Sequence, residues 1–434
     1  MAALVLALSG LATVHVGWSW LGPASDETRV GTQVAFLREA LEGGAGPAMQ
    51  QLFPEGDLFT HVLTGTAAAR LAAGPVERAG DPTIRAGHLS LARRALAALD
   101  APRNRDLFAG VSLPPSGVFW HGWRLHLLVD LALAAAGSAN GTASPAGDTA
   151  PDRQAVADRQ AVADEAAVLR AALQSSAGGT TGDPLLQSYP GQAWPCDNVV
   201  ALAALARAGD LLGTADRDLA RRRLALLDRV RDPETGLLAH RATPDGRVLD
   251  GPRASSQAII MTFLPDLDGA VTRRDWAAYT RAFVVRVGGL VGVREYPIGR
   301  EGAGDVDSGP LVLGVSASAS AVTLAAARRV GDLALAETLD REAELLGLGF
   351  SWGGTRRYAA GQLPVGDAFL AWARTTPIGD LTDAGVSAAP RPWWALLVAA
   401  AALPGLLALL ALRRLRRGPG DRPGAPAHSG VAGA

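Results

Sequence analysis

The sequence is poor in the residue types that build several common kinds of site. A single cysteine in 434 residues excludes an intrachain disulfide framework and any zinc or iron–sulfur site that needs several cysteine ligands. Charged residues make up only 19% of the chain, and the formal net charge of −1 gives no electrostatic reason to expect a nucleic-acid partner. We therefore predict that the protein does not bind nucleic acid.

The familiar metal and cofactor motifs are missing as well. The chain contains no HExxH zinc signature, no CxxC pair and no Walker-type glycine loop. Glycine and serine do gather in residues 314–320, but the apolar run around them predicts a helix, in which small residues favour close helix packing over phosphate binding. We predict a protein that uses neither a metal nor a cofactor.

Apolar residues, at 48%, are abundant, and one long apolar run lies near the C-terminus. Residues 393–412 carry no charge, open on the pair Trp393–Trp394 and are followed by several arginines, which is typical of a membrane-spanning helix with its aromatic belt and basic flank. The positive-inside rule places the basic tail, residues 413–434, in the cytoplasm and the preceding domain outside the membrane. Rich in Pro, Gly and Ala, the tail is predicted to be disordered.

A second apolar run, residues 1–22, opens the chain. It fits a signal anchor, a cleaved signal peptide or a buried helix, and we favour the anchor. The protein would have two membrane spans if this segment is an anchor and one if it is not. In either case the main domain is predicted to be extracytoplasmic.

Between these runs, apolar helices alternate with amphipathic, arginine-rich helices, and strand-like alternation is scarce. Two helices recur at intervals of roughly 50–75 residues, which is typical of helical hairpins. Six hairpins predict an all-α (α/α)6 toroid over residues 28–376, followed by a linker, 377–392; an open solenoid is the rival. Turn residues around Asp245–Gly246 predict one short β-hairpin on the rim. The apolar helices are expected to start near Asp57, His121, Asp197, Ser256, Asp307 and Asp367.

In a toroid these starts meet at one end, so scattered polar residues become one candidate site. Helix N-termini favour anions, which lowers carboxylate pKa values and activates thiols unless burial reverses the shift. Each candidate also has a purely structural interpretation: a helix cap for an aspartate, a small buried apolar group for the cysteine, a core residue for the histidine. The predicted catalytic residues are Asp57, His121, Cys196, Asp197, Asp305 and Asp307.

Asp305 and Asp307, two residues apart, could divide acid and base roles or bind a cation. Aromatic residues are only 5% of the chain, yet several fall in the expected rim loops, where they could stack on a sugar ring or enclose an apolar ligand. The predicted substrate-binding residues are Tyr189, Trp194, Trp120, Arg253, Gln257, Tyr296 and Trp352.

The hairpin count and the polar junctions resemble the six-hairpin toroid superfamily, which includes glycoside hydrolases, polysaccharide lyases and terpene-handling enzymes. Within it, the chain order Asp57, His121, Cys196 is similar to that of the linalool dehydratase/isomerase family. That resemblance implies cofactor-independent acid–base chemistry on a small alkenol, with Asp57 and His121 transferring protons and Cys196 acting at the substrate hydroxyl. The family's second cysteine has no counterpart here.

Three functions therefore stay open. The first is a dehydratase/isomerase-like reaction, which uses the unusual Cys196. The second is hydrolysis or lysis of an envelope or extracellular glycan, for which the junctions, with Glu301 as a further acid, supply the two carboxyl groups required. The third is a non-catalytic toroid that binds a glycan or a protein. In this last case, all carboxylates of the site would pair with arginines such as Arg253, Arg294 and Arg356.

Overall fold

The computed structural model describes residues 1–21, 27–74, 82–139, 150–176, 182–382 and 391–416. The chain divides into two compact units, one made of residues 1–22 with 389–434 and the other of residues 23–388. Residues 383–390 of the predicted linker, and the predicted tail from residue 417 onward, lie outside the described residues.

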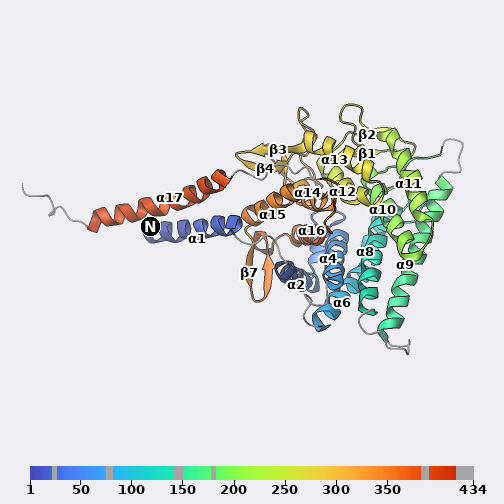
Figure 1. Ribbon diagram of the computed structural model, residues 1–434, viewed down its shortest axis with the longest axis horizontal. Coiled ribbons are helices and arrows are strands. Elements are labelled where there is room, and N and C mark those ends of the chain that lie inside the picture. The colour runs from blue at the N-terminus through green and yellow to red at the C-terminus, as the bar shows by residue number, and fades with distance from the viewer. Residues whose placement is uncertain (22–26, 75–81, 140–149, 177–181, 383–390, 417–434) are drawn as a thin grey trace, which may run out of the picture. The chain divides into compact units, whose positions relative to one another are not determined.

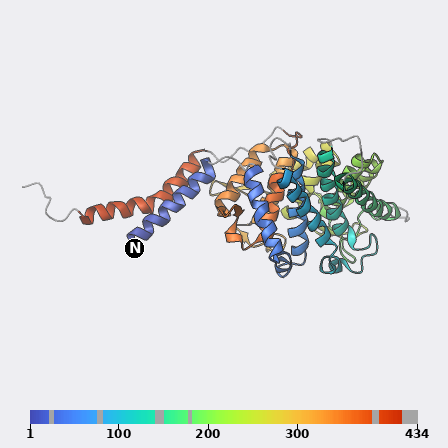
Figure 2. The same cartoon turned by 90° about the horizontal axis from the view of Figure 1, so that it is seen from below.

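The larger unit is built around a closed ring of six inner helices (Figures 1 and 2). Each inner helix packs against the next one along the chain, and the last, α16, packs against the first, α4. The ring is therefore closed, which confirms the (α/α)6 toroid and excludes the open solenoid. The inner helices are α4 (Gly56–Ala73), α8 (Gly117–Ala139), α10 (Pro195–Leu212), α12 (Ala254–Phe263), α14 (Ala317–Val330) and α16 (Pro364–Thr375).

Six outer helices surround this ring, and each packs against one or two inner ones. The first of them, α2, precedes the inner helices in the chain but contacts both α4 and α16, so the two ends of the domain meet where the ring closes. The outer helices are α2 (Glu27–Glu42), α6 (Pro82–Leu99), α9 (Ala150–Ser176), α11 (Asp216–Leu226), α13 (Gly269–Phe283) and α15 (Leu333–Leu346).

Burial explains why the two rings differ in composition. In α10 every residue from Pro195 to Ala206 is buried, because other helices cover it on all sides, and such a helix must be apolar all round. In the outer helix α6 the buried residues Leu91, Ala92, Ala95 and Leu99 recur at helical spacing, which is the pattern of a helix that covers a core on one side only.

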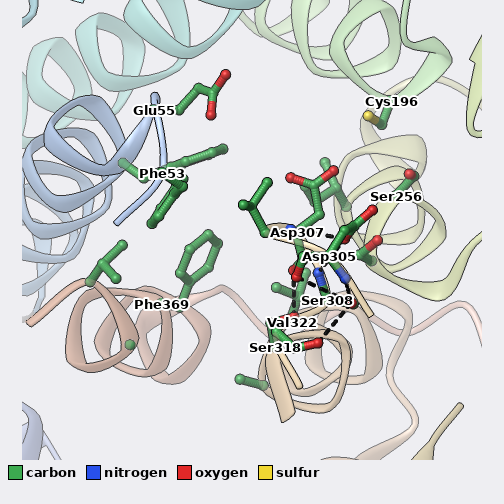
Figure 3. Close-up of a pocket in the computed structure, with 18 of the residues that line it drawn as sticks. Phe53, Glu55, Cys196, Ser256, Asp305, Asp307, Ser308, Ser318, Val322 and Phe369 are labelled. Carbon is green, nitrogen blue, oxygen red and sulfur yellow. Dashed lines mark hydrogen bonds between the residues drawn. The ribbon is translucent and has the colours of Figure 1, made fainter. Parts of the chain in front are cut away.

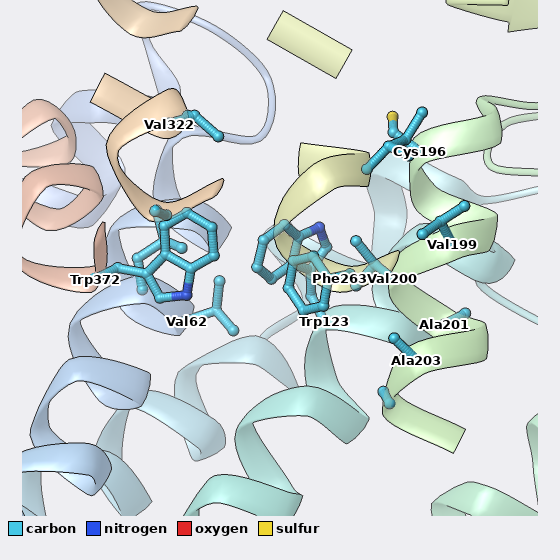
Figure 4. Packing of buried hydrophobic residues seen from close by; sticks show 14 of the residues in the cluster. Val62, Trp123, Cys196, Val199, Val200, Ala201, Ala203, Phe263, Val322 and Trp372 are labelled. Atoms are coloured by element: carbon cyan, nitrogen blue, oxygen red, sulfur yellow. The ribbon is translucent and has the colours of Figure 1, made fainter. Parts of the chain in front are cut away.

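A cluster of aromatic side chains fills the centre of the ring (Figure 4). The Trp123 ring of α8 lies 5.4 Å from Phe263 of α12 and 6.0 Å from Trp372 of α16, measured between ring centroids. Phe59 of α4 packs edge-on against Trp123 at 5.4 Å. These four residues come from four different inner helices, so they close the middle of the toroid and form a solid floor rather than a channel.

Short elements complete the connections between the helices. The predicted rim hairpin around Asp245–Gly246 is confirmed, with Arg241 paired with Asp250, and three further two-stranded hairpins were not predicted. The strands are β1 (Arg241–Ala242), β2 (Val248–Asp250), β3 (Val284–Val287), β4 (Leu290–Val293), β5 (Leu311–Val312), β6 (Val315–Ser316), β7 (Phe350–Trp352) and β8 (Thr355–Arg357). The short helices are α3 (Ala45–Gln50) and α7 (Pro102–Arg105), with 3₁₀ turns at Asp106–Phe108, Leu227–Val230, Leu264–Asp266 and Ala359–Gly361.

Five of the six inner helices begin within a turn of the predicted position, but the start near Asp307 was wrong. The apolar run that follows Asp307 first forms the hairpin β5–β6, whose turn residues Leu313 and Gly314 both have positive φ, as a two-residue hairpin turn requires. Only then does α14 begin, with the Ser316 hydroxyl accepting a hydrogen bond from the Ala319 amide at 3.0 Å.

The smaller unit is a pair of packed helices, α1 (Ala2–Leu21) and α17 (Arg391–Arg416). Each contains a window long and apolar enough to cross a membrane, Ala2–Ser19 and Trp394–Arg413. The Ser9 hydroxyl of α1 donates to the Ala401 carbonyl of α17 at 2.5 Å and accepts from the Gly405 amide at 3.0 Å. Pro404 weakens the backbone hydrogen bonding of α17 at this turn, and Ser9 supplies partners to the groups beside it.

The α4–α6 contact gives a prediction for stability. A Cβ atom at Gly65 would lie 2.7 Å from the Ala95 Cβ and 3.1 Å from a Leu127 methyl, so Gly65→Ala forces helices apart. We expect it to destabilise the toroid by about 1–3 kcal/mol. Gly87→Ala in α6 is the matched control: it meets no atom within 4 Å and should stabilise by about 0.5–1 kcal/mol through helix propensity. Thermal unfolding followed by tryptophan fluorescence measures both changes; equal effects would contradict the close approach.

Candidate functional site

A cavity of about 600 Å³ lies at the end of the toroid where the inner helices begin (Figure 3). Its lining residues come from all six inner helices or from the loops just before them, as the toroid prediction required. Phe59 belongs to both the lining and the aromatic cluster, so the cluster forms the floor of the cavity. Representative lining residues are Glu55, Phe119, Cys196, Ser256, Ala321 and Phe369.

Asp197 is the most enclosed carboxyl group of the cavity, at 6% exposure. Burial raises its pKa to about 7, and the charges of Asp307 and Glu55 act in the same direction, against hydrogen bonds from Ser188 and Cys196. Burial thus outweighs the helix N-terminus, and Asp197 carries a proton in a large share of molecules at neutral pH. The helix-cap interpretation was wrong, because the N-cap residue of α10 is Trp194.

Asp307 projects into the same cavity from the loop that precedes β5 (Figure 3). Burial, together with the charges of Asp305 and Glu55, raises its pKa to about 6. Its side chain is nevertheless 46% exposed, so water solvates it better than it solvates Asp197. Asp307 is therefore the ionised member of the pair near neutral pH, and it does not cap a helix.

Asp305 holds the loop in place through an arginine and two backbone amides. An Arg253 nitrogen lies 2.5 Å from its carboxylate, and Arg253 also donates to Glu295 at 2.9 Å. Burial would raise the pKa of Asp305, but the Arg253 hydrogen bond and charge lower it to about 2. The same carboxylate accepts the backbone amides of Asp307 and Ser308 at 3.0 and 3.1 Å. Within the described residues, no three His, Cys, Asp or Glu side chains form a candidate metal site.

His240, which precedes β1, lies behind Asp307. Its Nδ1 contacts the Ser256 hydroxyl, and its Nε2 is 3.9 Å from the Asp307 carboxylate. Burial and the nearby Arg253 charge lower the pKa of His240 to about 3. The imidazole is therefore neutral at physiological pH, and it does not neutralise Asp307 by forming an ion pair.

Tyr189 and Trp194 line the cavity as predicted aromatic residues, with their rings 5.3 Å apart. The Tyr189 hydroxyl donates to the Glu55 carboxylate. Burial and the Glu55 charge raise the pKa of Tyr189, so the phenol stays protonated and remains a hydrogen-bond donor. Glu55 thus receives a partner that carries no charge.

Cys196 also lines the cavity, but the structure contradicts its activation. The thiol is 5% exposed and donates to the Asp197 carboxyl, with sulfur and oxygen 3.6 Å apart. Burial and the charges of Asp197 and Asp307 raise the pKa of the Cys196 thiol well above its usual value. The group is a neutral hydrogen-bond donor and not a thiolate nucleophile.

The other two members of the Asp–His–Cys order are not among the cavity-lining residues. Asp57 is fully buried in the first turn of α4, where Arg103 and Asn104 donate to it at 2.5 and 2.8 Å. His121 contacts Glu165 through Nδ1 and the Pro115 carbonyl through Nε2, the latter at 2.6 Å. Both ring nitrogens of His121 are thus engaged in the protein, and the predicted trio is not assembled in one site.

The remaining predicted substrate-binding residues lie outside the lining too. Two arginine guanidinium groups lie 5.2 Å from the centroid of the Trp120 ring, and Trp120 donates to the Leu99 carbonyl at 3.0 Å. Gln257 donates to the Leu238 carbonyl at 2.7 Å, and the Tyr296 hydroxyl donates to the Ala303 carbonyl at 2.9 Å. Trp352 stands 78% exposed on the β7–β8 hairpin. Arg253 forms the ion pair with Asp305 that is described above.

Sequence reasoning missed several lining residues. Glu55 stands two positions before Asp57, and only the orientation of the first turn of α4 decides which of the two faces the cavity. His240 lies in a connection that gave only a hairpin signal. Phe53 and Phe369 also line the cavity and were not predicted, although an aromatic residue beside a helix start is a usable signal.

No protein-family model and no curated protein matches the sequence. A comparison with solved structures finds the unsaturated glucuronyl hydrolase of Bacillus sp. GL1, which is described as responsible for glycosaminoglycan degradation. The two chains share 16% identity at a TM-score of 0.40, and the match covers 86% of this chain and 96% of that one. At this level the match supports no conclusion about the site or its substrate.

The raised thiol pKa gives a direct test, because Cys196 is the only cysteine. We expect iodoacetamide to label the native protein far more slowly than an unfolded control in guanidinium, with no plateau of the rate up to pH 9. Rapid native labelling at pH 7 would show a thiolate and overturn this assignment.

Proposed function

We propose that this protein is an acid–base enzyme that hydrolyses glycosidic bonds in the cavity of the toroid. One observation carries the proposal: two carboxyl groups, Asp197 and Asp307, share a cavity, and their surroundings favour the protonated form of the first and the ionised form of the second at the same pH. Glycoside hydrolysis requires this pairing of a carboxylic acid with a carboxylate.

In the proposed reaction, Asp197 donates its proton to the oxygen of the leaving group. Asp307 either takes a proton from the attacking water or attacks the anomeric carbon itself, depending on the separation of the carboxyl groups with substrate bound. Asp305 keeps Asp307 in place through the backbone hydrogen bonds described above. The stereochemistry of the first product, read by proton NMR, distinguishes the two routes.

Two other functions are less well supported. A dehydratase/isomerase of the linalool type would use Asp57, His121 and Cys196 together, but only Cys196 lines the cavity. A non-catalytic toroid would have all its site carboxylates paired with arginines. Asp305 is paired in this way, whereas no ion pair between an arginine and either Asp197 or Asp307 occurs within the described residues.

We further propose that the toroid is anchored outside the cytoplasmic membrane by two spans, α1 and α17. Two spans place both chain ends on the same side of the membrane, and the arginines after residue 412 place that side in the cytoplasm. The Ser9 hydroxyl supports a retained α1, because its removal would leave backbone groups of α17 beside Pro404 without this partner.

The pKa values predict the pH dependence of hydrolysis. Asp197 is active when protonated, so activity falls as pH rises through about 7. Asp307 is active when ionised, so activity falls as pH drops through about 6. We expect a bell-shaped profile of kcat/KM with its maximum between these values. A panel of aryl glycosides supplies the assay.

Asp197→Asn and Asp307→Asn should each lower kcat by at least 100-fold, because each removes a proton-transfer group. Asp197→Asn should not lower the melting temperature at pH 8, because it replaces a carboxylate whose charge burial disfavours. Glu301→Gln, an exposed change outside the cavity lining, is the control. Full activity of Asp197→Asn would exclude Asp197 as the acid.

The membrane topology has its own test. Epitope tags at the two ends should be found on one chain, and protease should remove both tags in inside-out vesicles but neither in intact spheroplasts. Loss of the N-terminal tag from the mature protein would show a cleaved signal peptide. Opposite accessibility of the two tags would rule out the two-span arrangement.

A further inference from the structure

The cavity has a polar side and an aromatic side, and the Glu55 carboxylate lies beside Phe53 on the aromatic side. Asp197 of α10 and Asp307 of the loop before β5 lie on the polar side. An aromatic wall made of Phe53, Phe59 and Phe369 forms the other side: the Phe59 centroid is 6.5 Å from that of Phe53 and 5.3 Å from that of Phe369. Figure 3 shows Phe53 and Phe369 across the open space from Asp307.

Large apolar side chains of the lining are also left uncovered. Leu52 is 58% exposed, Val306 is 60% exposed and Leu363 is 44% exposed. Exposed apolar side chains are ordinary when they are scattered, but these three all line the same cavity as the aromatic wall. A ligand with an apolar part would remove this surface from water, and binding would gain from it.

The charges of the cavity exclude an anionic head group. None of the described residues that line it is an arginine or a lysine, and Glu55, Asp197, Asp305 and Asp307 are carboxyl groups. Arg253, the guanidinium behind the polar side, is already engaged by Glu295 and Asp305. His240 is neutral at physiological pH, so no cation remains in the lining to hold a phosphate, a sulfate or a uronate.

From these observations we propose that the substrate is an amphiphilic glycoside, with an uncharged sugar beside Asp197 and Asp307 and an alkyl or aryl aglycone against the aromatic wall. The inference rests on the proposed hydrolysis and specifies its substrate class. In the overall reaction, the bond between the anomeric carbon and the aglycone oxygen breaks. The aglycone oxygen gains the Asp197 proton, and the anomeric carbon gains the hydroxyl of a water whose other proton passes to a carboxylate. The products are a free sugar and an apolar alcohol.

The test uses the full chain in lipid nanodiscs, because detergent would compete for an apolar site. The probes are methyl, propyl and hexyl thioglycosides of common neutral sugars in both anomeric forms, which cannot be hydrolysed readily. Calorimetric titration of the Asp197→Asn variant should show the affinity rising about two- to fourfold for each added methylene that reaches the wall. Hexyl glucuronide, matched in chain length but anionic, should bind at least tenfold more weakly than hexyl glucoside.

A pair of leucine variants assigns the effect to the cavity. Leu363→Ser, in the cavity lining, should reduce the gain in affinity from the methyl to the hexyl probe at least threefold. Leu346→Ser, at the end of α15 and 65% exposed, removes a leucine that does not line the cavity and should leave the gain unchanged. Both positions are exposed enough for the fold to tolerate serine.

The outcomes separate this inference from the proposed function. Affinity that rises with chain length and depends on Leu363 supports the amphiphilic substrate. Hydrolysis of methyl and hexyl glycosides with equal kcat/KM, together with flat affinities, overturns it and leaves glycoside hydrolysis standing. Chain-length-dependent binding without hydrolysis of any glycoside keeps the cavity preference but removes the proposed reaction. Tighter binding of the glucuronide than of the glucoside overturns the charge argument.

Discussion

The packing of α16 against α4 is the contact on which the rest of this structure depends, because it closes the inner ring. A closed ring brings the starts of six helices to one end and turns six distant loops into the walls of one cavity. In an open row of hairpins, the loop that carries Asp307 and the segment that carries Glu55 would have no reason to meet. Closure also requires α2, the first helix of the domain, to cover the junction between α4 and α16.

Closure has an electrostatic consequence as well. The aromatic cluster around Trp123 fills the centre of the ring, and side chains placed just above it lose most of their contact with water. A carboxyl group in this position keeps its proton to a higher pH, which is how Asp197 acquires a pKa near 7 at a helix start that would otherwise favour its anion. Asp305 is two residues from Asp307, but its pKa is lowered because Arg253 forms an ion pair with it. One loop therefore carries two aspartates with different roles.

The candidate site could be anticipated only in part. Cys196, Asp197, Asp305 and Asp307, with the aromatic residues Tyr189 and Trp194, were expected at the junctions and do line the cavity. Asp57 and His121 occupy equivalent junctions but are directed toward other helices, where Arg103 and Glu165 hold them. A shift of one residue at a helix start decides whether a side chain faces the cavity or a neighbouring helix. Hydrophobic periodicity does not place a helix start to within one residue.

The sequence alone was enough to predict the architecture. A helix that is buried on all sides must be apolar all round, and a helix that is buried on one side is amphipathic. The regular alternation of the two kinds of helix can therefore be recognised from the residue types alone. Two properties depended on the tertiary structure. One is which member of each junction faces the cavity, because neighbouring helices compete for the side chain. The other is the protonation state of each acid, since burial and distant charges such as Arg253 fix it and neither is local in the chain.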